Sequence, residues 1–344
     1  MGSGRFWFSS AAALAMAAAA VGGAAPTAVG QEAKTIQIDG SSTVAPIMNA
    51  ATELFRKENK DIRPPRVGVS GTGGGFKKFL DKQANLRTDI SNASRPISES
   101  EKKLAVEAGV EYIEIPVAYD GMAVVVNPKN TWCDHLTVEE LKKIWGPDSK
   151  ITNWKDVRAG FPDKPLRLFG PGTDSGTYDY FAEAVVGGKK TRSDYNASEN
   201  DNTLVKGVAG DEGGLGYFGF AYFEANEKSL KLLAIDAGDG KPVTPDLNKI
   251  RSNEYHPLSR PLFIYVNATS AGRPEVQKFV HFLLKNAKSI VEHPKVGYVA
   301  LDPEFYAMAL KRFDERVTGS VYTDAASVHR PLAEVYGVKK AETP

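Results

Sequence analysis

One arrangement occurs three times in this chain and limits the folds that it can adopt. A short extended segment ends, a few glycine, serine and threonine residues follow, and apolar residues then recur at helical spacing. The three polar segments are 40–43, 71–75 and 170–177. Because strands alternate with amphipathic helices around these segments, the sequence predicts an α/β fold.

Short apolar or alternating runs predict the strands. They lie at residues 34–39, 66–69, 89–93, 121–127, 165–169 and 261–267. We interpret the runs 121–127 and 261–267 as lying beside two crossovers between lobes, because they bracket the middle third of the chain. Lobe 1 would then comprise 31–118 plus 263–344, and lobe 2 would comprise 119–262. A chain of this length exceeds the usual size of a single core, which also favours two lobes.

The first thirty residues have the layout of a secretory signal peptide. Arg5 is the only charged residue before Glu32, an Ala-rich apolar stretch follows it, and Ala28 and Gly30 place small residues at a cleavage site. No cysteine lies near that site, which argues against a lipid anchor. No other segment approaches the ~18 apolar residues that span a bilayer. We therefore expect a soluble protein that is free in a periplasm.

The composition argues against several classes of protein. Without residues 1–30, which hold Arg5 and no acid, the formal charge is 42 − 42 = 0, so nucleic acid and anionic membranes are not expected as main partners. Cys133 is the single cysteine and cannot form an intrachain disulfide. The five histidines show no metal-ligand spacing. We expect no metal, no cofactor and a monomeric chain.

The three polar segments have the chemistry of an anion site. The first turn of a helix has unpaired N–H groups and the positive end of the helix dipole, which attract anions. Ser42 and Ser175 fit either this role or that of an ordinary N-cap. Glycines 73–75 each cost on the order of 1 kcal/mol relative to alanine where a helix opens, which favours a functional reason for them.

Arg95 lies between a predicted strand and Pro96. A guanidinium at such a position suits bidentate pairing with a tetrahedral oxyanion. The alternative is a weak surface salt bridge, which is the commoner fate of an arginine. We predict that Arg95 is the cation of the candidate pocket.

Several stretches, in order and at matching spacing, resemble the phosphate-binding proteins of the high-affinity phosphate ABC transporter, particularly their cyanobacterial-type branch. They are DGSSTVAPI (39–47), SGTGGGFKKF (70–79), NASRPIS (92–98), AYDGMAVVVN (118–127), LFGPGTDSGTYDYF (168–181), GLGYFGFAY (214–222) and YHPLSRPLFIYVN (255–267). This resemblance implies a type II periplasmic-binding-protein fold. Its two lobes, each a mixed sheet flanked by helices, would be joined by a two-segment hinge and close over dehydrated phosphate.

The resemblance also implies which residues contact the ligand. The positions that match are Ser42, Thr43, Thr72, Ser175, Gly176 and Thr177. Two positions depart from the enterobacterial branch of the family, which has an aspartate in place of Arg95 and an arginine in place of Pro171. The arginine therefore lies in a different segment of this chain than in that branch. The carboxylate that accepts the ligand's proton there has no counterpart at the matching position.

The missing carboxylate concerns selectivity. Hydrogen phosphate can donate a hydrogen bond and sulfate near neutral pH cannot, so a buried carboxylate favours phosphate over sulfate. Asp174 and Asp201 are the candidates for a replacement acceptor. Each fits equally well as a helix cap or a solvated loop charge.

The sequence therefore predicts a protein that binds inorganic phosphate and delivers it to the membrane permease of an ABC importer. A binding protein for another oxyanion, such as sulfate or molybdate, is the main alternative. A periplasmic phosphatase is disfavoured, because Ser175 has no histidine at a recognisable spacing and no metal-ligand cluster is present. We expect no enzymatic activity.

Overall fold

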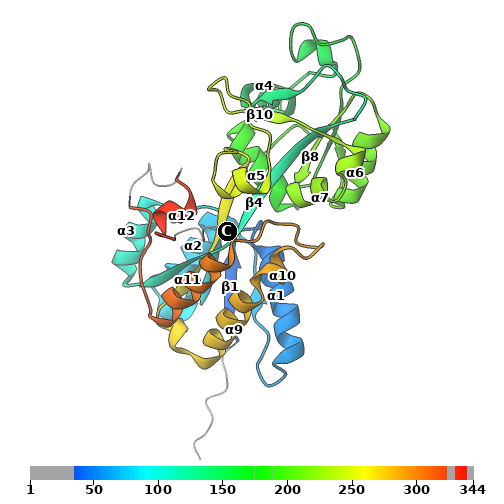
Figure 1. Cartoon of the computed structure of the whole chain (residues 1–344). Helices are drawn as coiled ribbons and strands as arrows, with labels where there is room; N and C mark the ends of the chain where they lie inside the picture. The colour runs from blue at the N-terminus through cyan, green and yellow to red at the C-terminus, as the bar shows by residue number, and fades with distance from the viewer. Residues whose placement is uncertain (1–34, 174, 189, 324–329, 339–344) are drawn as a thin grey trace, which may run out of the picture. The chain divides into compact units, whose positions relative to one another are not determined.

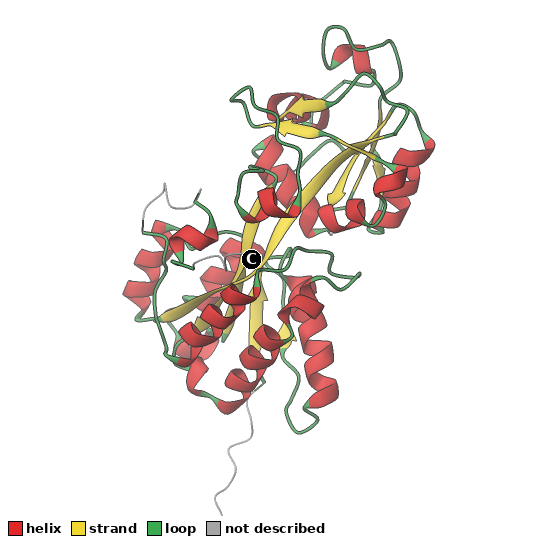
Figure 2. Ribbon diagram, viewed as in Figure 1, coloured by secondary structure: helices red, strands yellow, loops and turns green. Residues whose placement is uncertain are grey.

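The computed structural model describes residues 35–173, 175–188, 190–323 and 330–338, and the predicted α/β fold is confirmed (Figure 1). Strands are flanked by helices throughout (Figure 2). The predicted signal peptide, 1–30, lies outside the described residues. Among the described residues, no helix combines the length and the apolar character that crossing a bilayer requires.

Nine strands of the described residues form one mixed sheet. In spatial order they are β2 (Arg66–Val67), β1 (Gln37–Gly40), β3 (Ile90–Ala93), β11 (Ser259–Asn267), β4 (Tyr112–Val126), β8 (Gly214–Gly219), β6 (Arg167–Gly170) and β7 (Asn196–Ala197), and β9 (Lys231–Leu232) pairs with β4. A separate two-stranded sheet joins β5 (His135–Thr137) and β10 (Ala234–Asp236). The predicted strands therefore exist, with ends displaced by a few residues except at the start of β4.

Strand β4 connects the two halves of the main sheet. Residues 112–121 pair antiparallel with β11, and residues 122–126 pair antiparallel with β8. The apolar run 121–127 predicts only the second of these parts. The strand begins nine residues earlier because Glu114 and Asp120, although charged, are completely buried within it.

Helices begin at or directly after the three polar segments, as the apolar spacing there predicts, and others occur along the chain. They are α1 (Ala45–Glu58), α2 (Gly71–Phe79), α3 (Glu99–Ala108), α4 (Val138–Trp145), α5 (Gly176–Phe181), α6 (Asp201–Gly210), α7 (Phe220–Glu224), α8 (Leu247–Arg251), α9 (Pro274–Lys285), α10 (Ala287–Val291), α11 (Pro303–Asp314) and α12 (Leu332–Val335). In α1, Ile47, Ala51 and Phe55 recur at this spacing and are fully buried. A π-helical turn, Ala182–Val186, extends α5. Burial of one apolar face holds such helices against the sheet.

The glycine-rich segment 71–75 forms the start of helix α2 and is not a separate segment ahead of it. Gly71 has a φ of 74°, which a glycine adopts without steric cost. At Gly75 a Cβ atom would lie 2.5 Å from the Cα atom of Gly40. The helix therefore approaches β1 more closely than any side chain permits, and this packing offsets the poor helix propensity of glycine.

Candidate functional site

A polar cavity of about 800 Å³ lies at the ends of β1 and β3 and the start of α2. Residues from α5, from the π-helical turn and from β11 complete its wall. Four of the seven predicted ligand residues line it, namely Ser42, Thr43, Thr72 and Arg95. Segments that are far apart in the sequence thus converge on one hollow, as the anion-site hypothesis requires.

The other three predicted residues lie at the start of α5. The Gly176 carbonyl oxygen accepts a hydrogen bond from Thr43 Oγ1 at 3.2 Å. A Cβ atom on Gly176 would lie 2.5 Å from the Thr43 Cα atom, so only glycine fits there. Ser175 Oγ accepts a hydrogen bond from the Thr177 amide at 3.1 Å and is the N-cap of the helix. Gly176 therefore borders the cavity wall through Thr43, and Ser175 and Thr177 adjoin it in the chain.

Thr72 connects two of the three polar segments. Its Oγ1 atom lies 3.0 Å from Ser94 Oγ and accepts a hydrogen bond from the Ser94 amide at 3.1 Å. Both residues line the cavity. The hydroxyl groups of α2 and of the segment after β3 are consequently held next to each other.

Arg95 lines the cavity but is paired within the protein. Its Nη1 and Nη2 atoms donate to the two carboxylate oxygens of Glu101 at 2.8 and 2.9 Å. Glu101 is also part of the capping box of α3 with Ser98. Burial tends to raise the pKa of Glu101, but hydrogen bonds from Arg95 and Ser98 hold it below its ordinary value. Arg95 thus forms a salt bridge, which was the alternative to its role as an anion ligand. The two nitrogen atoms that could bind an oxyanion are paired with Glu101.

Arg260, at the start of β11, is a cavity cation that the sequence interpretation missed. Its side chain is 13% exposed, and its Nη2 atom donates to Thr43 Oγ1 at 3.0 Å. Its guanidinium carbon lies 3.5 Å from the ring centroid of Tyr180, within the range of a cation–π contact. The available signal is a charged residue next to an otherwise apolar strand. Arg260 directly precedes the predicted strand 261–267 and was therefore not included in it.

Two carboxylates also line the cavity, and neither was a predicted site residue. Asp179 Oδ2 accepts a hydrogen bond from Ser42 Oγ at 2.7 Å, and Glu183 Oε2 lies 3.6 Å from Arg260 Nη1. Within the described part of the chain, the lining does not include the candidate acceptor Asp201, the first residue of α6. Burial raises the pKa of Asp201 to about 6, with a contribution from the nearby Glu199.

The other candidate acceptor, Asp174, lies outside the described residues. The described residues contain no group of three or more histidine, cysteine, aspartate or glutamate side chains that could hold a metal ion.

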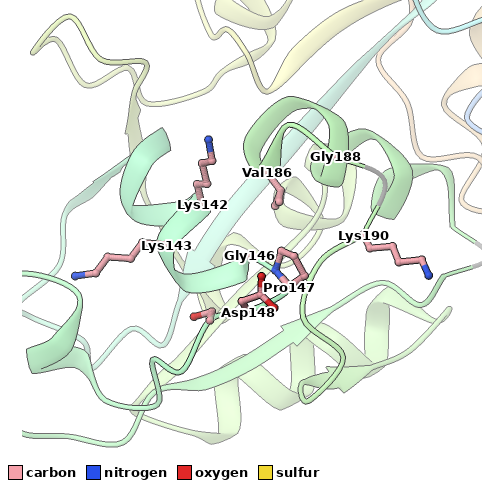
Figure 3. Close-up of a pocket in the computed structure, with 9 residues that line it drawn as sticks. Lys142, Lys143, Gly146, Pro147, Asp148, Val186, Gly188 and Lys190 are labelled. Atoms are coloured by element: carbon pink, nitrogen blue, oxygen red, sulfur yellow. The ribbon is translucent and has the colours of Figure 1, made fainter.

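A second hollow, of about 650 Å³, lies beside the end of α4 (Figure 3). Gly146, Pro147 and Asp148 are among the residues that line it, and no predicted ligand residue belongs to it. The side chains of Lys142 and Lys143 point in different directions instead of converging (Figure 3). The hydroxyl-rich cavity is therefore the candidate ligand site.

Comparison with known proteins places the chain in a family. Residues 25–287 match the PBP superfamily domain. The chain is 48% identical over 295 residues to protein SphX of Synechococcus elongatus, with 85% of each chain covered. The chain belongs to the PBP superfamily. It is also 37% identical over 297 residues to the phosphate-binding protein PstS of Staphylococcus saprophyticus, covering 86% of this chain and 89% of that one. The resemblance to the cyanobacterial-type phosphate-binding proteins is thus confirmed.

Solved structures of this superfamily have the same fold. A possible phosphate-binding protein from Planctomyces limnophilus has a TM-score of 0.77 and 45% identity, covering 82% of this chain and 98% of that chain. An ABC-type phosphate transport receptor from Vibrio cholerae has a TM-score of 0.58 and 25% identity, covering 77% of this chain and 100% of that chain. The expected periplasmic-binding-protein fold is therefore confirmed at the level of the α/β architecture.

Proposed function

We propose that the protein binds inorganic phosphate in the hydroxyl-rich cavity, in a periplasm, and delivers it to the permease of an ABC importer. The observation that carries this proposal is the convergence of Ser42, Thr43, Thr72 and Arg260 on one hollow. Hydroxyl groups and a guanidinium together are suited to a tetrahedral oxyanion. The names of the PstS relative and of the similar solved structures support phosphate as that oxyanion.

The proposed ligand contacts extend the predicted set by one residue. Ser42, Thr43, Thr72 and the 175–177 segment supply hydroxyl or backbone N–H donors, Arg95 contributes positive charge at the rim, and Arg260 supplies the second guanidinium. Arg260 is already positioned by Thr43 and Tyr180. Arg95 donates two short hydrogen bonds to Glu101, whereas the nearest carboxylates to Arg260, those of Asp120 and Glu183, lie 3.6 Å away. Arg260 is therefore the stronger candidate for direct contact with the anion.

We further propose that lobe 1 (31–118 plus 263–344) and lobe 2 (119–262) close over the ligand about a two-segment hinge. The point at which β4 exchanges β11 for β8 as its partner supports this division, because it falls at Gly121 and Met122. Strand β11 pairs with β4 beside this point and would be the second segment.

We assign to Asp179 the role of the carboxylate that selects phosphate over sulfate. This carboxylate lines the cavity and contacts Ser42, whereas Asp201 does not line it within the described chain. An ionised carboxylate can accept the hydrogen bond that hydrogen phosphate donates, and it repels sulfate, which has no proton to offer. Among the described residues, the cavity lining contains no histidine to act as a base for Ser42, which favours binding over hydrolysis.

Isothermal titration of phosphate-stripped protein with phosphate, arsenate, sulfate and molybdate tests the proposal. We expect phosphate and arsenate to bind most tightly. Sulfate or molybdate binding as tightly as phosphate would transfer the assignment to another oxyanion. Release of phosphate from a phosphomonoester, lost in Arg260→Gln, would instead identify an enzyme.

A further inference from the structure

Two charged side chains face each other where strands β4 and β11 run beside the cavity. Asp120 and Arg260 are directly opposite in the antiparallel register. Asp120 is completely buried, and Arg260 Nε lies 3.6 Å from its Oδ2 atom. This separation is too long for a normal hydrogen bond, so the two groups attract each other mainly as charges.

Asp120 lacks hydrogen-bond partners. Among the described residues, neither of its carboxylate oxygens has a donor within reach, and the buried Nε atom of Arg260 has no acceptor. A buried carboxylate without hydrogen bonds is costly to keep ionised. The charge of Arg260 is therefore what holds the proton off Asp120.

Glu114 provides a comparison on the same strand, six residues earlier. It is also completely buried, but it accepts hydrogen bonds from the Tyr265 and Tyr336 hydroxyls, from Ser320 Oγ and from the Val321 amide. These four contacts range from 2.6 to 3.1 Å. The lack of hydrogen-bond donors is thus specific to Asp120 and is not shared by the other buried acid of β4, Glu114.

Arg260 links Asp120 to the ligand cavity. It lines the cavity, and its Nη2 atom donates to Thr43 Oγ1. An oxyanion that contacts the guanidinium from the cavity side would compete with Asp120 for the same positive charge. The two negative charges would also repel each other across a poorly hydrated space.

We infer that Asp120 is the proton-exchanging counter-charge of Arg260: it balances the guanidinium in the ligand-free protein and takes up a proton when an oxyanion binds. This inference rests on the proposed function and specifies how the same site responds to pH. The proton enters from solvent and is released again when the ligand leaves, so that the charge near the guanidinium stays balanced.

The surroundings of Asp120 favour such an exchange near neutral pH. Burial raises the pKa of Asp120 to about 6, against the lowering effect of Arg260. Among the described residues, Tyr180 on α5 and Tyr298 also interact with Asp120, and burial raises the pKa values of both well above 10. Both tyrosines stay neutral in the range of interest. Glu183 faces Arg260 from the cavity side.

The test compares phosphate affinity in the wild type and in Asp120→Asn at pH 5.5 and pH 8. A bound anion that raises the pKa of Asp120 by about one unit makes the wild type lose affinity as the pH rises through that range. The ratio of the wild-type Kd to the variant Kd should then rise about five- to tenfold from pH 5.5 to pH 8. The ionisation of phosphate itself and any constant effect of the substitution cancel in the change of this ratio with pH.

Glu114→Gln is the matched control, because it removes a buried carboxylate from the same strand away from the cavity. The ratio of the wild-type Kd to the Glu114→Gln Kd should stay constant within about twofold between pH 5.5 and pH 8. Glu114 keeps its four donors whether or not ligand is bound. A second measurement uses the wild type alone: phosphate-induced infrared difference spectra at pH 6.5 should show a new protonated-carboxyl band. About half a proton per bound phosphate is expected.

The inference is overturned by a constant ratio for Asp120→Asn, or by the absence of the carboxyl band in a wild type that binds phosphate. The second outcome applies even if Asp120→Asn does not fold. A wild type that binds no phosphate overturns the proposed function itself, and the wild-type isotherm distinguishes that result from a failure of the proton exchange.

Discussion

Substituting each cavity arginine in turn gives the sharpest functional prediction. Arg260→Gln removes a side chain that is 13% exposed, points to the cavity and is held by Thr43 and Tyr180. Arg95→Gln removes one that is 38% exposed and already paired with Glu101. The two substitutions are chemically identical and differ only in the contacts that the arginine makes.

The structure sets the expected magnitudes. A charge-assisted hydrogen bond from a buried cation contributes about 1.5–3 kcal/mol, so the loss of two such bonds to the anion costs about 3–6 kcal/mol, or about 150- to 20,000-fold in Kd. Arg95 shares its charge with Glu101 and is partly exposed to solvent, so its loss should cost about 1 kcal/mol or less, below about tenfold.

Isothermal titration with phosphate at pH 7, at fixed ionic strength, measures both values. Thermal unfolding without phosphate checks that each variant is folded, because Arg260→Gln leaves Asp120 without its counter-charge. A larger loss of affinity for Arg95→Gln than for Arg260→Gln would refute the assignment of the two arginines and restore Arg95 as the main cation.

Three further substitutions test other parts of the site and the fold. Gly176→Ala should weaken phosphate binding about tenfold or more, because the added Cβ atom would collide with the Thr43 backbone. An unchanged titration isotherm would show that this close contact is not needed for binding. Glu114→Gln should lower the free energy of unfolding in urea by about 2–3 kcal/mol, because the amide cannot accept from all four donors, while the Kd for phosphate stays within about twofold; equal stability would contradict the role of these donors. Asp179→Asn should weaken phosphate about tenfold and strengthen sulfate in competition titrations, and unchanged selectivity would remove Asp179 as the acceptor.

Local pattern was enough to predict most of the secondary structure. The alternation and spacing around 34–58 predict β1 and α1, because one face of each element is buried. The first half of β4 was missed because the buried Glu114 and Asp120 interrupt its apolar run. Their partners lie far away in the sequence, and no local pattern encodes such a contact.

In the candidate site too, local sequence pattern predicts some residues but not those that are brought together by contacts between distant parts of the chain. The glycine and hydroxyl segments are local signals of an anion site, and the family resemblance implies Ser42, Thr43 and Thr72 within them as ligand contacts. Arg260 was not, since it is 217 positions from Thr43 and is brought to it only by the pairing of β11 within the sheet. Asp179 carries no motif of its own and is defined by its contact with Ser42.

The most direct test of the account is a crystal structure of the protein grown with phosphate. The account predicts one tetrahedral anion in the hydroxyl-rich cavity, within hydrogen-bond distance of Thr72, of the 42–43 segment and of the Arg260 guanidinium. An anion bound instead at the lysine-lined hollow beside α4, with the hydroxyl-rich cavity holding none, would contradict it.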